Sequence, residues 1–356
     1  MKYMIITYFA LFIGTQALAQ HTMQGYISDT KTGEKLIGCS VYISSTTEGV
    51  TSNNYGFYSI KTNKLPARLV FSYIGYISDT LEFRNSVENS NISLTPKTSD
   101  LKEVEIKATG TATSTPRTGV LTIPVQQIKQ LPALGGEVDV LKAFQLMPGV
   151  QGGTEGTSGL YVRGGTPDQN LVLLDDIPLY YVNHIGGFVS VFDVNAINDI
   201  KLIKGGFPAR YGGRLSSVVD IRMKTGNSTG LKGEYGIGIL ASRLFIEGPL
   251  SKNKKTKFMF SIRRCNIDLV TRLATRMQSN LEYSAGYTFY DLYSKVTHQF
   301  DAKNSLSFSF YNGRDNIFFK QRDRGDVGAV TFFDYKANIK WGNTLASFKW
   351  NHQYNS

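Results

Sequence analysis

The sequence predicts a mainly β protein with three regions: a small β-sandwich, a compact α+β domain and a series of longer antiparallel strands. The chain has 356 residues, including 35 Gly, 20 Tyr and 21 Phe, a composition typical of strands joined by many turns. Turn signals recur about every ten residues between Met23 and Pro96, as in small sandwiches. After Leu231 the apolar and polar residues alternate over longer runs.

Residues 1–19 have the features of a secretory signal peptide. Lys2 supplies the positive charge, Met4 to Ile13 form a short apolar run, and Ala17 to Ala19 form an A-x-A cleavage site. The apolar run is too short for a membrane-spanning helix. We therefore expect an exported protein, and no cysteine follows the predicted cleavage site to carry a lipid.

Residues 20–98 are predicted to form the sandwich, with turns near Asp29, Thr46, Asn53 and Leu65. The detail GYISDTKTGEKLIGCSVYI, followed by GVTSNNYGFYSI, resembles the carboxypeptidase-regulatory-like domain, a transthyretin-like β-sandwich. The resemblance does not imply peptidase activity, because a zinc peptidase needs clustered ligands. The four histidines are scattered along the chain at His21, His184, His298 and His352.

Residues 120–226 are predicted to form the α+β domain. A helical turn is expected at Pro124–Ile128 and a helix at Glu137–Met147, which Pro148 ends. Leu171–Leu174 has the pattern of a strand buried on both faces. The glycine-rich loop Gln151–Gly159 is not a phosphate-binding loop, since neither Lys-Ser/Thr nor a helix follows it.

An ordered series of motifs in this region resembles the plug domain of TonB-dependent outer-membrane receptors. The series runs through GLYVRGGTPDQNLVLLDDIP at Gly159–Pro178, IKLIKGG at Ile200–Gly206, FPARYGGR at Phe207–Arg214 and SVVDI at Ser217–Ile221. The regulatory-like domain often precedes the plug in receptors of Bacteroidetes type. The residues that form the core of the motif are Arg163, Gly164, Gly165, Asp175, Asp176, Arg210, Gly212, Gly213 and Arg214.

The resemblance implies a receptor for TonB-dependent active uptake in the cell outer membrane, without an enzyme active site, a cofactor or a metal. The expected partners are TonB, outer-membrane lipid and an unidentified solute, and a surface lipoprotein is a further candidate. The alternative function is that of a secreted or surface adhesion or sensor protein built of β-sandwiches, without transport. A hydrolase is not indicated, because no serine elbow, zinc cluster or catalytic carboxylate pair is visible.

The charged residues of the plug motif have two interpretations that do not exclude each other. The charged residues lie among apolar residues and glycines and are Arg163, Asp175, Asp176, Arg210 and Arg214. The charges can hold the plug inside a barrel through ion pairs that a pull would disturb. They can equally form structural pairs within the plug itself.

Residues 99–119 are predicted to be a TonB-box-like segment and a linker on the periplasmic side, together with the sandwich. In DLKEVEIKA, which begins at Asp100, four residues resemble the L-x-E-V-x-V form of the box: Leu101, Glu103, Val104 and Ile106. Such a segment would add as a strand to a sheet edge of TonB. The polar stretch Thr109–Gly119 supplies a tether. The alternative is a last strand of the sandwich, and position favours the box.

Residues 227–356 are predicted to form the first strands of an outer-membrane β-barrel. Short turns at 249–255, 301–304 and 342–343 alternate with long loops around 265–286 and 314–328, as in such barrels. Six aromatic residues are candidates for the girdles at the membrane surfaces: Tyr287, Phe289, Tyr290, Tyr293, Trp341 and Trp350.

About seven candidate strands are visible, whereas plugged barrels close at about 22. An incomplete barrel with an open edge is not stable in lipid. We therefore interpret the sequence as the N-terminal part of a receptor, through a truncated record, a split gene or a pseudogene product, which would not transport on its own.

The charge of the chain is concentrated in its last third. Of 39 Lys+Arg and 28 Asp+Glu, residues 227–356 hold 19 and 10, a balance of +9 out of the total of +11. Because the protein is expected to be exported, nucleic acid is not the expected partner of these surplus positive charges. Anionic lipid head groups or an anionic solute are the favoured partners. Cys39 and Cys265 lie far apart in the sequence and are expected to be unpaired core residues rather than a disulfide.

Overall fold

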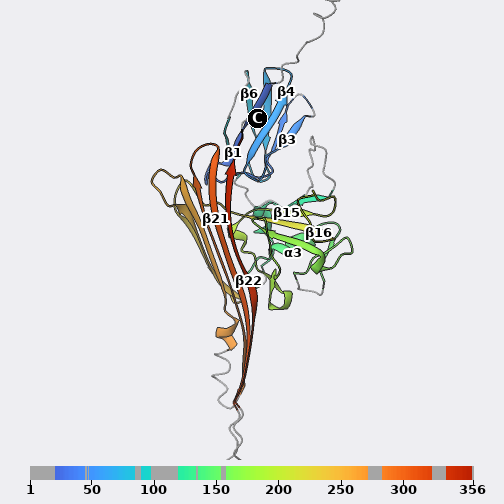
Figure 1. The fold of residues 1–356 in the computed structure, drawn as a ribbon, viewed down its shortest axis with the longest axis vertical. Coiled ribbons are helices and arrows are strands. Elements are labelled where there is room, and N and C mark those ends of the chain that lie inside the picture. The colour runs from blue at the N-terminus through green and yellow to red at the C-terminus, as the bar shows by residue number, and fades with distance from the viewer. Residues whose placement is uncertain are drawn as a thin grey trace, which may run out of the picture. The chain divides into compact units, whose positions relative to one another are not determined.

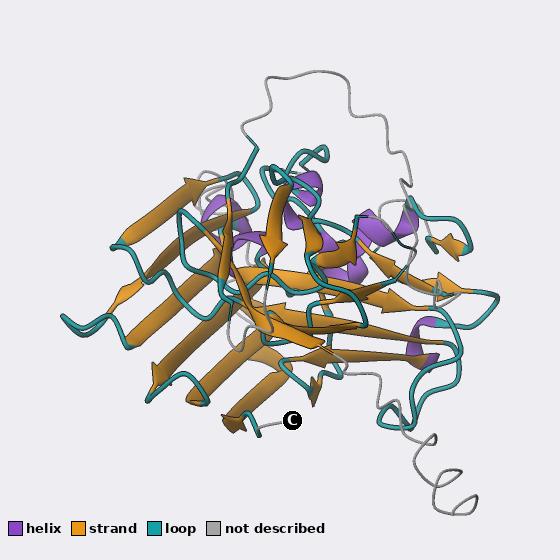
Figure 2. Ribbon diagram, turned by 90° about the horizontal axis from the view of Figure 1, so that it is seen from above, coloured by secondary structure: helices purple, strands orange, loops and turns teal. Residues whose placement is uncertain are grey.

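The computed structural model describes residues 21–44, 46, 48–84, 90–97, 119–133, 135–153, 158–271, 283–322 and 334–354. The chain divides into two compact units, Met1–Pro116 and Arg117–Ser356. Strands dominate both and the helices are few and short (Figure 2), which confirms the predicted mainly β class. The signal peptide, the TonB-box-like segment and most of the linker lie outside the described residues. Within the described part of the chain, no helix is long and apolar enough to span a membrane.

The first unit is a two-sheet sandwich, as predicted. One sheet has the order β4-β1-β7 and the other the order β3-β2-β5-β6. Alternate residues of β1 and β5 are buried, so that the inner faces of the sheets form one apolar core around Met23, Ile27, Leu69 and Phe71. The strands are β1 (His21–Asp29), β2 (Ser40–Ile43), β3 (Gly49–Thr51), β4 (Phe57–Thr62), β5 (Ala67–Ser72), β6 (Asp79–Phe83) and β7 (Ile92–Leu94).

The second unit begins with a five-stranded mixed sheet of order β12-β11-β16-β15-β8. Its central pair, β11 and β16, is parallel and almost completely buried. These strands are β8 (Val120–Thr122), β11 (Asn170–Leu174), β12 (Ile177–Pro178), β15 (Ile197–Ile203) and β16 (Ser217–Met223). Short elements complete the domain: α2 (Val125–Ile128), α3 (Val140–Gln145), β9 (Val150–Gln151), β10 (Tyr161–Val162), η1 (Pro167–Gln169), β13 (Asn183–His184), η2 (Ile185–Gly187), β14 (Val189–Ser190) and η3 (Val194–Ala196).

Both predicted helices of this domain are present, and α3 is shorter than expected. Asp139 caps its N-terminus, because the carboxylate accepts hydrogen bonds from the backbone N–H groups of Leu141 at 2.8 Å and Lys142 at 3.1 Å. The helix buries Leu141 and Phe144 in the core of the domain. The predicted buried strand Leu171–Leu174 corresponds to β11.

A two-residue turn, Asp175-Asp176, joins β11 to β12, since Leu174 pairs with Ile177. Both aspartates have positive φ, 50° and 75°, as in the type I′ turns that suit the twist of a hairpin. Asn and Gly are the usual residues in such turns, because positive φ is unfavourable for residues with a larger side chain. The two aspartates are therefore held in this conformation by other contacts, which are described below.

The rest of the second unit is an antiparallel sheet of six strands in chain order, β17 to β22. Figure 1 shows the elements β15, β16 and α3 beside its long strands β21 and β22. We call the half of the sheet near residues 301–304 the proximal half and the opposite half the distal half. The strands are β17 (Lys232–Ile237), β18 (Ala241–Pro249), β19 (Thr256–Cys265), β20 (Tyr283–Gln299), β21 (Asn304–Arg322) and β22 (Asp334–His352).

The predicted tight turn at Gly342-Asn343 is wrong: β22 runs through it without interruption, opposite β21 in constant register. Likewise β21 continues past Arg314 to Arg322, so the described sheet has six strands where about seven were expected. The sequence misled because the apolar positions change from odd numbers in 335–341 to even numbers in 344–350. A change of phase looks like a new strand, but here the apolar side chains change from one face of a single strand to the other.

The structure also corrects the aromatic girdle. Phe289 and Tyr293 are 1% and 2% exposed and belong to buried clusters on the inner face of the sheet. Tyr287 and Trp341 lie on the same face by alternation, and their rings are 6.4 Å apart. Of the six predicted aromatics, Tyr290 and Trp350 lie on the outer face.

Gly342 tests the continuity of β22. A Cβ atom at this position would lie 2.0 Å from the carbonyl oxygen of Gly313 on β21, so Gly342→Ala would force the two strands apart. We expect the substitution to lower the free energy of unfolding by about 1–3 kcal/mol, measured by urea denaturation. Gly212→Ala is the control, because nothing lies within 4 Å of a Cβ there. Equal stability of the two variants would contradict the close approach of β21 and β22.

Candidate functional site

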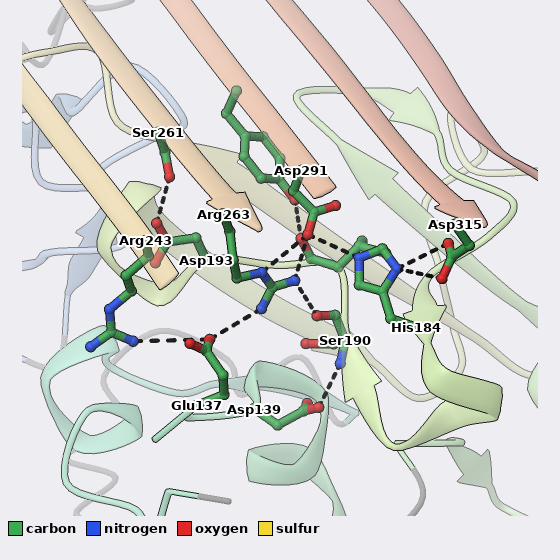
Figure 3. A network of polar contacts seen from close by, with 12 residues as sticks. Glu137, Asp139, His184, Ser190, Asp193, Arg243, Ser261, Arg263, Asp291 and Asp315 are labelled. Carbon is green, nitrogen blue, oxygen red and sulfur yellow. Dashed lines mark hydrogen bonds and ion pairs between the residues drawn. The ribbon is translucent and has the colours of Figure 1, made fainter. Parts of the chain in front are cut away.

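The candidate site is the interface between the α+β domain and the inner face of the six-stranded sheet. One apolar core joins the two, because Phe245, Met259, Tyr293 and Tyr311 of the sheet belong to the same cluster as α3, β15 and β16. Across this core, a network of polar contacts connects the segment 183–195 to strands β19 to β21 and Glu137 to β18 and β19 (Figure 3).

Arg263 of β19 is at the centre of the network. Its side chain is 1% exposed and reaches Asp291 of β20 at 2.7 Å, the carbonyl oxygen of Ser190 at 2.7 Å and Glu137 at 3.4 Å. Its position follows from strand alternation, which directs Ser261, Arg263 and Cys265 to the inner face of the sheet. A charge buried this completely is tolerated only when paired and hydrogen-bonded, and Arg263 satisfies that condition with groups from both sides of the interface.

His184 of β13 lies between two carboxylates of the sheet. Its Nε2 is 2.9 Å from Asp291 and its Nδ1 is 2.9 Å from Asp315 of β21. The ring stacks on Phe289 with a centroid distance of 4.1 Å. Tyr311 donates to the other oxygen of Asp291 at 2.9 Å, and Tyr287 donates to Asp315. Every charged atom around the imidazole thus has a partner.

Both ring nitrogens of His184 face carboxylate oxygens, so the arrangement favours the imidazolium, which donates from both. Burial alone would lower the pKa of His184, but the neighbouring carboxylates Asp291 and Asp315 outweigh it and raise the pKa above its usual value of 6.5. With His184 protonated, the three carboxylates Glu137, Asp291 and Asp315 face three cations, Arg243, Arg263 and His184.

Further hydrogen bonds attach the same segment of the domain to α3 and the sheet. Asp139, besides capping α3, accepts from the backbone N–H of Ser190 at 2.6 Å and from Ser158 Oγ at 2.5 Å. Ser261 Oγ of β19 donates to Asp193 at 2.5 Å. Tyr293 of β20 donates to the carbonyl oxygen of Val191. The segment is therefore positioned through its backbone as well as its side chains.

A second cluster joins the Asp175-Asp176 turn to the proximal half of the sheet. Lys295 of β20 donates to Asp175 at 2.9 Å, and both side chains are buried. Asp176 pairs with Arg222 of β16 and with Lys349 of β22. Partial burial raises the pKa of Asp176, but the two cations outweigh it and lower the pKa to about 2. These ion pairs account for the positive φ of both aspartates.

The second cluster continues across the domain to the FPARYGGR motif. Arg222 also pairs with Asp220 at 2.9 Å, Asp220 accepts from Tyr211 at 3.0 Å, and Tyr211 accepts from Arg210 at 2.5 Å. The guanidinium of Arg210 lies 4.6 Å from the Tyr211 ring centroid. A continuous chain of contacts thus runs from Arg210 to Lys349 of the sheet.

A third contact comes from Asn343 of β22, the residue expected in a turn. Its side-chain oxygen accepts from the backbone N–H groups of Tyr180 and Tyr181, and its amide donates to the carbonyl oxygen of Tyr181 at 2.7 Å. The Asn343 side chain thus both accepts hydrogen bonds from and donates one to the backbone of the exposed loop after β12, as a peptide group of a neighbouring strand would.

The predicted site residues divide into two groups. Asp175 and Asp176 contact the sheet, as the first interpretation of the charges expects. The other charges contact their own domain, as the second expects: Arg210 bonds Tyr211, Arg214 donates to the carbonyl oxygen of Gly213, and the backbone N–H of Arg163 donates to Gly149. Three of the four motif glycines have a structural reason, since Gly164 and Gly213 have φ of 83° and 82° and a Cβ at Gly165 would lie 2.4 Å from Ser216 Oγ.

Sequence reasoning missed most residues that the sheet contributes. They share one signal, a charged residue at the inward position of an alternating strand, where an apolar residue would be expected: Arg263, Asp291, Lys295, Asp315 and Lys349. His184 was noted only as a scattered histidine. Among the residues that the structure describes, no group of three or more His, Cys, Asp or Glu side chains could hold a metal ion, and Cys39 and Cys265 are free and buried.

His184 makes the interface sensitive to pH. Because its pKa is raised in the folded protein, its contribution to stability is complete below about pH 6.5 and disappears as the pH rises through the raised pKa. We expect the free energy of unfolding of the wild type to fall more between pH 6 and pH 9 than that of His184→Gln. His352→Gln, at the exposed end of β22, is the control and should keep the wild-type profile. Identical profiles for the wild type and His184→Gln would contradict a buried imidazolium.

Arg263 should be among the costliest residues to remove. Arg263→Leu leaves Asp291 and Glu137 without their main counter-charge inside the interface, which typically costs about 3–5 kcal/mol of stability. Arg314→Leu, on the exposed outer face of the same sheet, should cost about 0.5 kcal/mol or less. Urea denaturation of both variants checks the difference. A small loss in Arg263→Leu would mean that the network does not hold the interface together.

Two protein-family models match the chain. The CarboxypepD_reg-like domain matches residues 23–106, which cover the described sandwich except for the first two residues of β1. The TonB-dependent receptor plug domain matches residues 113–219, which cover β8, β11, β12, β15 and the start of β16 in the five-stranded sheet. The two matches lie in the order expected from the sequence motifs. The six-stranded sheet follows the plug match.

A curated relative and several solved receptors are similar to the chain. TonB-dependent receptor P3 of Formosa agariphila is 24% identical over 168 residues, which cover 46% of this chain and 17% of that protein. The siderophore receptor PirA of Pseudomonas aeruginosa matches 66% of this chain and 45% of its own, with 18% identity and a TM-score of 0.40. The siderophore receptor PiuA of Acinetobacter baumannii matches 66% and 34%, with 16% identity and a TM-score of 0.42.

The chain thus spans less than half the length of the relatives that it matches. It carries a regulatory-like sandwich, a plug and six antiparallel strands that enclose one side of the plug. With these domains in this order, the chain belongs to the TonB-dependent receptors of Bacteroidetes type and corresponds to the N-terminal portion of one.

Proposed function

We propose that the chain supplies the sandwich, plug and first barrel strands of an outer-membrane receptor that imports a solute with energy delivered by TonB. The observation that carries the proposal is the plug's attachment to the inner face of the sheet through buried ion pairs and hydrogen bonds. Water can replace these polar contacts when the plug moves, whereas the apolar part of the interface around Phe245 and Met259 resists separation. No catalytic step is required.

The outer face of the proximal half supports insertion in a membrane. Its side chains are apolar and exposed, including Phe308 at 46%, Phe348 at 72% and Trp350 at 66%. The apolar outer positions run from Leu306 to Phe310 on β21 and from Ala346 to Trp350 on β22, which is about half of the 9–11 residues with which a tilted transmembrane β-strand crosses a bilayer. By analogy with the family, the sandwich and the TonB-box-like segment would lie in the periplasm, on the side of the short turns.

Energy would enter through the segment before the plug. We propose Leu101, Glu103, Val104 and Ile106, which lie outside the described residues, as the strand that TonB captures. The first plug strand after the linker is β8, at the edge of the sheet, and it pairs with β15 through three residue pairs. A pull on the linker would therefore reach a short edge strand first, ahead of the buried strands β11 and β16.

The solute would meet the plug from the distal side of the sheet. There the plug exposes Tyr180 at 72% and Tyr181 at 52%, next to Asn343. The inner face of distal β22 continues this surface with Ile339 at 62% and Tyr335 at 59%. These side chains suit apolar or aromatic parts of a solute. Asn343 places the loop 180–181 in direct contact with the barrel, so a bound solute would be sensed by both.

Binding of the periplasmic domain of TonB tests the proposed box. Val104→Pro removes a backbone N–H donor and the conformational freedom that strand addition needs, so we expect the affinity for that domain to fall about tenfold or more in calorimetric titration. Thr113→Pro, in the linker, is the matched control and should bind as the wild type does.

Two outcomes would contradict the proposal. Equal binding of Val104→Pro and the wild type would remove these residues as the box. Recovery of the native protein in the soluble fraction instead of the outer membrane would remove the transport function and favour the adhesion or sensor alternative.

A further inference from the structure

The contact of His184 with the sheet differs from the other ion pairs between the plug and the sheet, which join a carboxylate to a lysine or an arginine, as in Asp175 with Lys295. Such side chains ordinarily keep their charge between about pH 6 and pH 9. An imidazole ordinarily titrates near pH 6.5, so this contact can change its charge within that range. His298 and His352 bond residues of the sheet itself.

The position of the His184 ring makes its contact with the sheet depend on its proton. Nε2 lies 2.9 Å from Asp291 and Nδ1 lies 2.9 Å from Asp315 (Figure 3), and the side chain is 1% exposed. A neutral imidazole carries a hydrogen on only one of its two nitrogens. Loss of the proton would therefore leave a nitrogen lone pair facing a carboxylate oxygen inside the interface, and the contact at that atom would become repulsive.

The two carboxylates depend on His184 to different degrees. Asp291 has a second cation, because Arg263 lies 2.7 Å from the same oxygen that His184 contacts. Asp315 is 2% exposed, and His184 is its only ion-pair partner among the residues that the structure describes. The ionisable groups around the ring come from strands β19, β20 and β21 and from the plug: Arg263, Cys265, Tyr287, Asp291, Tyr293, Tyr311, Asp315, Glu137 and Asp139.

The backbone after His184 is strained while the segment lies against the sheet. Ile185 has a φ of 52°, a conformation that is unfavourable for a β-branched residue and persists only where the surrounding contacts hold it. One of these contacts crosses the interface, because the backbone N–H of Ile185 donates to the Tyr287 hydroxyl of β20 at 2.7 Å. The segment 183–190 can therefore relax as soon as its contacts with the sheet are lost.

The protonation of His184 sets the direction of the pH dependence. The neighbouring carboxylates raise the pKa of His184 above 6.5 in the docked segment, and in water the ring returns to its ordinary value. Below about pH 6.5 the ring is protonated in both arrangements, so undocking does not depend on pH. Between about pH 6.5 and the raised pKa, only the docked ring holds the proton, and the equilibrium constant for undocking rises up to about tenfold per pH unit.

We propose that His184 is a proton-dependent latch between the plug and the sheet: the segment 183–190 docks on Asp291 and Asp315 while the imidazole is protonated, and it undocks with release of one proton to water. Strain at Ile185 favours the undocked arrangement once the proton has left. A rise in the external pH then weakens one attachment of the plug and makes the plug easier to displace. This consequence for uptake rests on the function proposed above, whereas the latch itself operates without TonB and without a solute.

Hydrogen–deuterium exchange of the intact receptor, purified from outer membranes and measured without TonB or solute, tests the latch. The protection of the Ile185 N–H, corrected for the intrinsic exchange rate at each pH, reports the undocking equilibrium. We expect this protection to fall about tenfold or more from about pH 6 to pH 9 in the wild type and to change by about twofold or less in His184→Gln. Val219, in the buried strand β16, is the internal reference and should keep its protection.

A second variant separates the proton from the packing of the ring. Asp315→Asn keeps His184 but removes the carboxylate that has no other cation, so the pKa of the docked ring is raised less and the fall in protection should be smaller than in the wild type. His352→Gln, at the exposed end of β22, is the control and should keep the wild-type profile.

Three results would overturn the latch. They are a flat profile in the wild type, an equal fall in the wild type and His184→Gln, and a fall at Val219 as large as that at Ile185, which would mean that the whole plug opens. A receptor that shows the expected profile but does not bind TonB would overturn the proposed function and leave the latch in place, so the two failures are distinguishable.

Discussion

Burial of charge between the plug and the sheet is the constraint on which the rest of the structure depends. Arg263, His184, Asp291 and Asp315 are almost completely inaccessible to water, so each must find its partners inside the interface. The partners come from both sides, and removal of the plug would leave Arg263 without Ser190 and Glu137. If the plug is displaced, water can hydrate these polar groups, while the apolar residues that the sheet shares with the plug, such as Phe245 and Met259, oppose the separation.

The alternation of side chains along the strands determines which residues of the sequence face the plug and which point away from it. On the inner face, several charged residues take the place of apolar ones opposite a counter-charge of the plug, as at Lys295 with Asp175. On the outer face, the apolar residues of the proximal half give way to Arg314, Lys320 and Lys340 in the distal half. Each face of a long strand such as β22 therefore has one environment in the proximal half and another in the distal half. For that reason the apolar residues of β22 change from odd to even positions at Gly342-Asn343.

Much of the fold could be predicted from the sequence, and much of the interface could not. The sandwich, the strand Leu171–Leu174 and the helix at Val140 follow from local patterns and motifs. Gly342-Asn343 was taken for a turn because local preference and a change of period agree there, whereas the close approach of Gly313 and the partners of Asn343 depend on chain segments far away in the sequence. Similarly, nothing near His184 indicates that two carboxylates more than a hundred residues later enclose it. Long-range pairing is invisible to local patterns.

The most direct test of this account is hydrogen–deuterium exchange of the intact receptor with and without the periplasmic domain of TonB under load. The account predicts faster exchange at β8 and at its partner β15, while β19, β20 and β21 keep their protection, because the movement of the plug starts from its edge strand. Faster exchange throughout the six-stranded sheet, or unchanged protection of β8 in a complex that has formed, would contradict it.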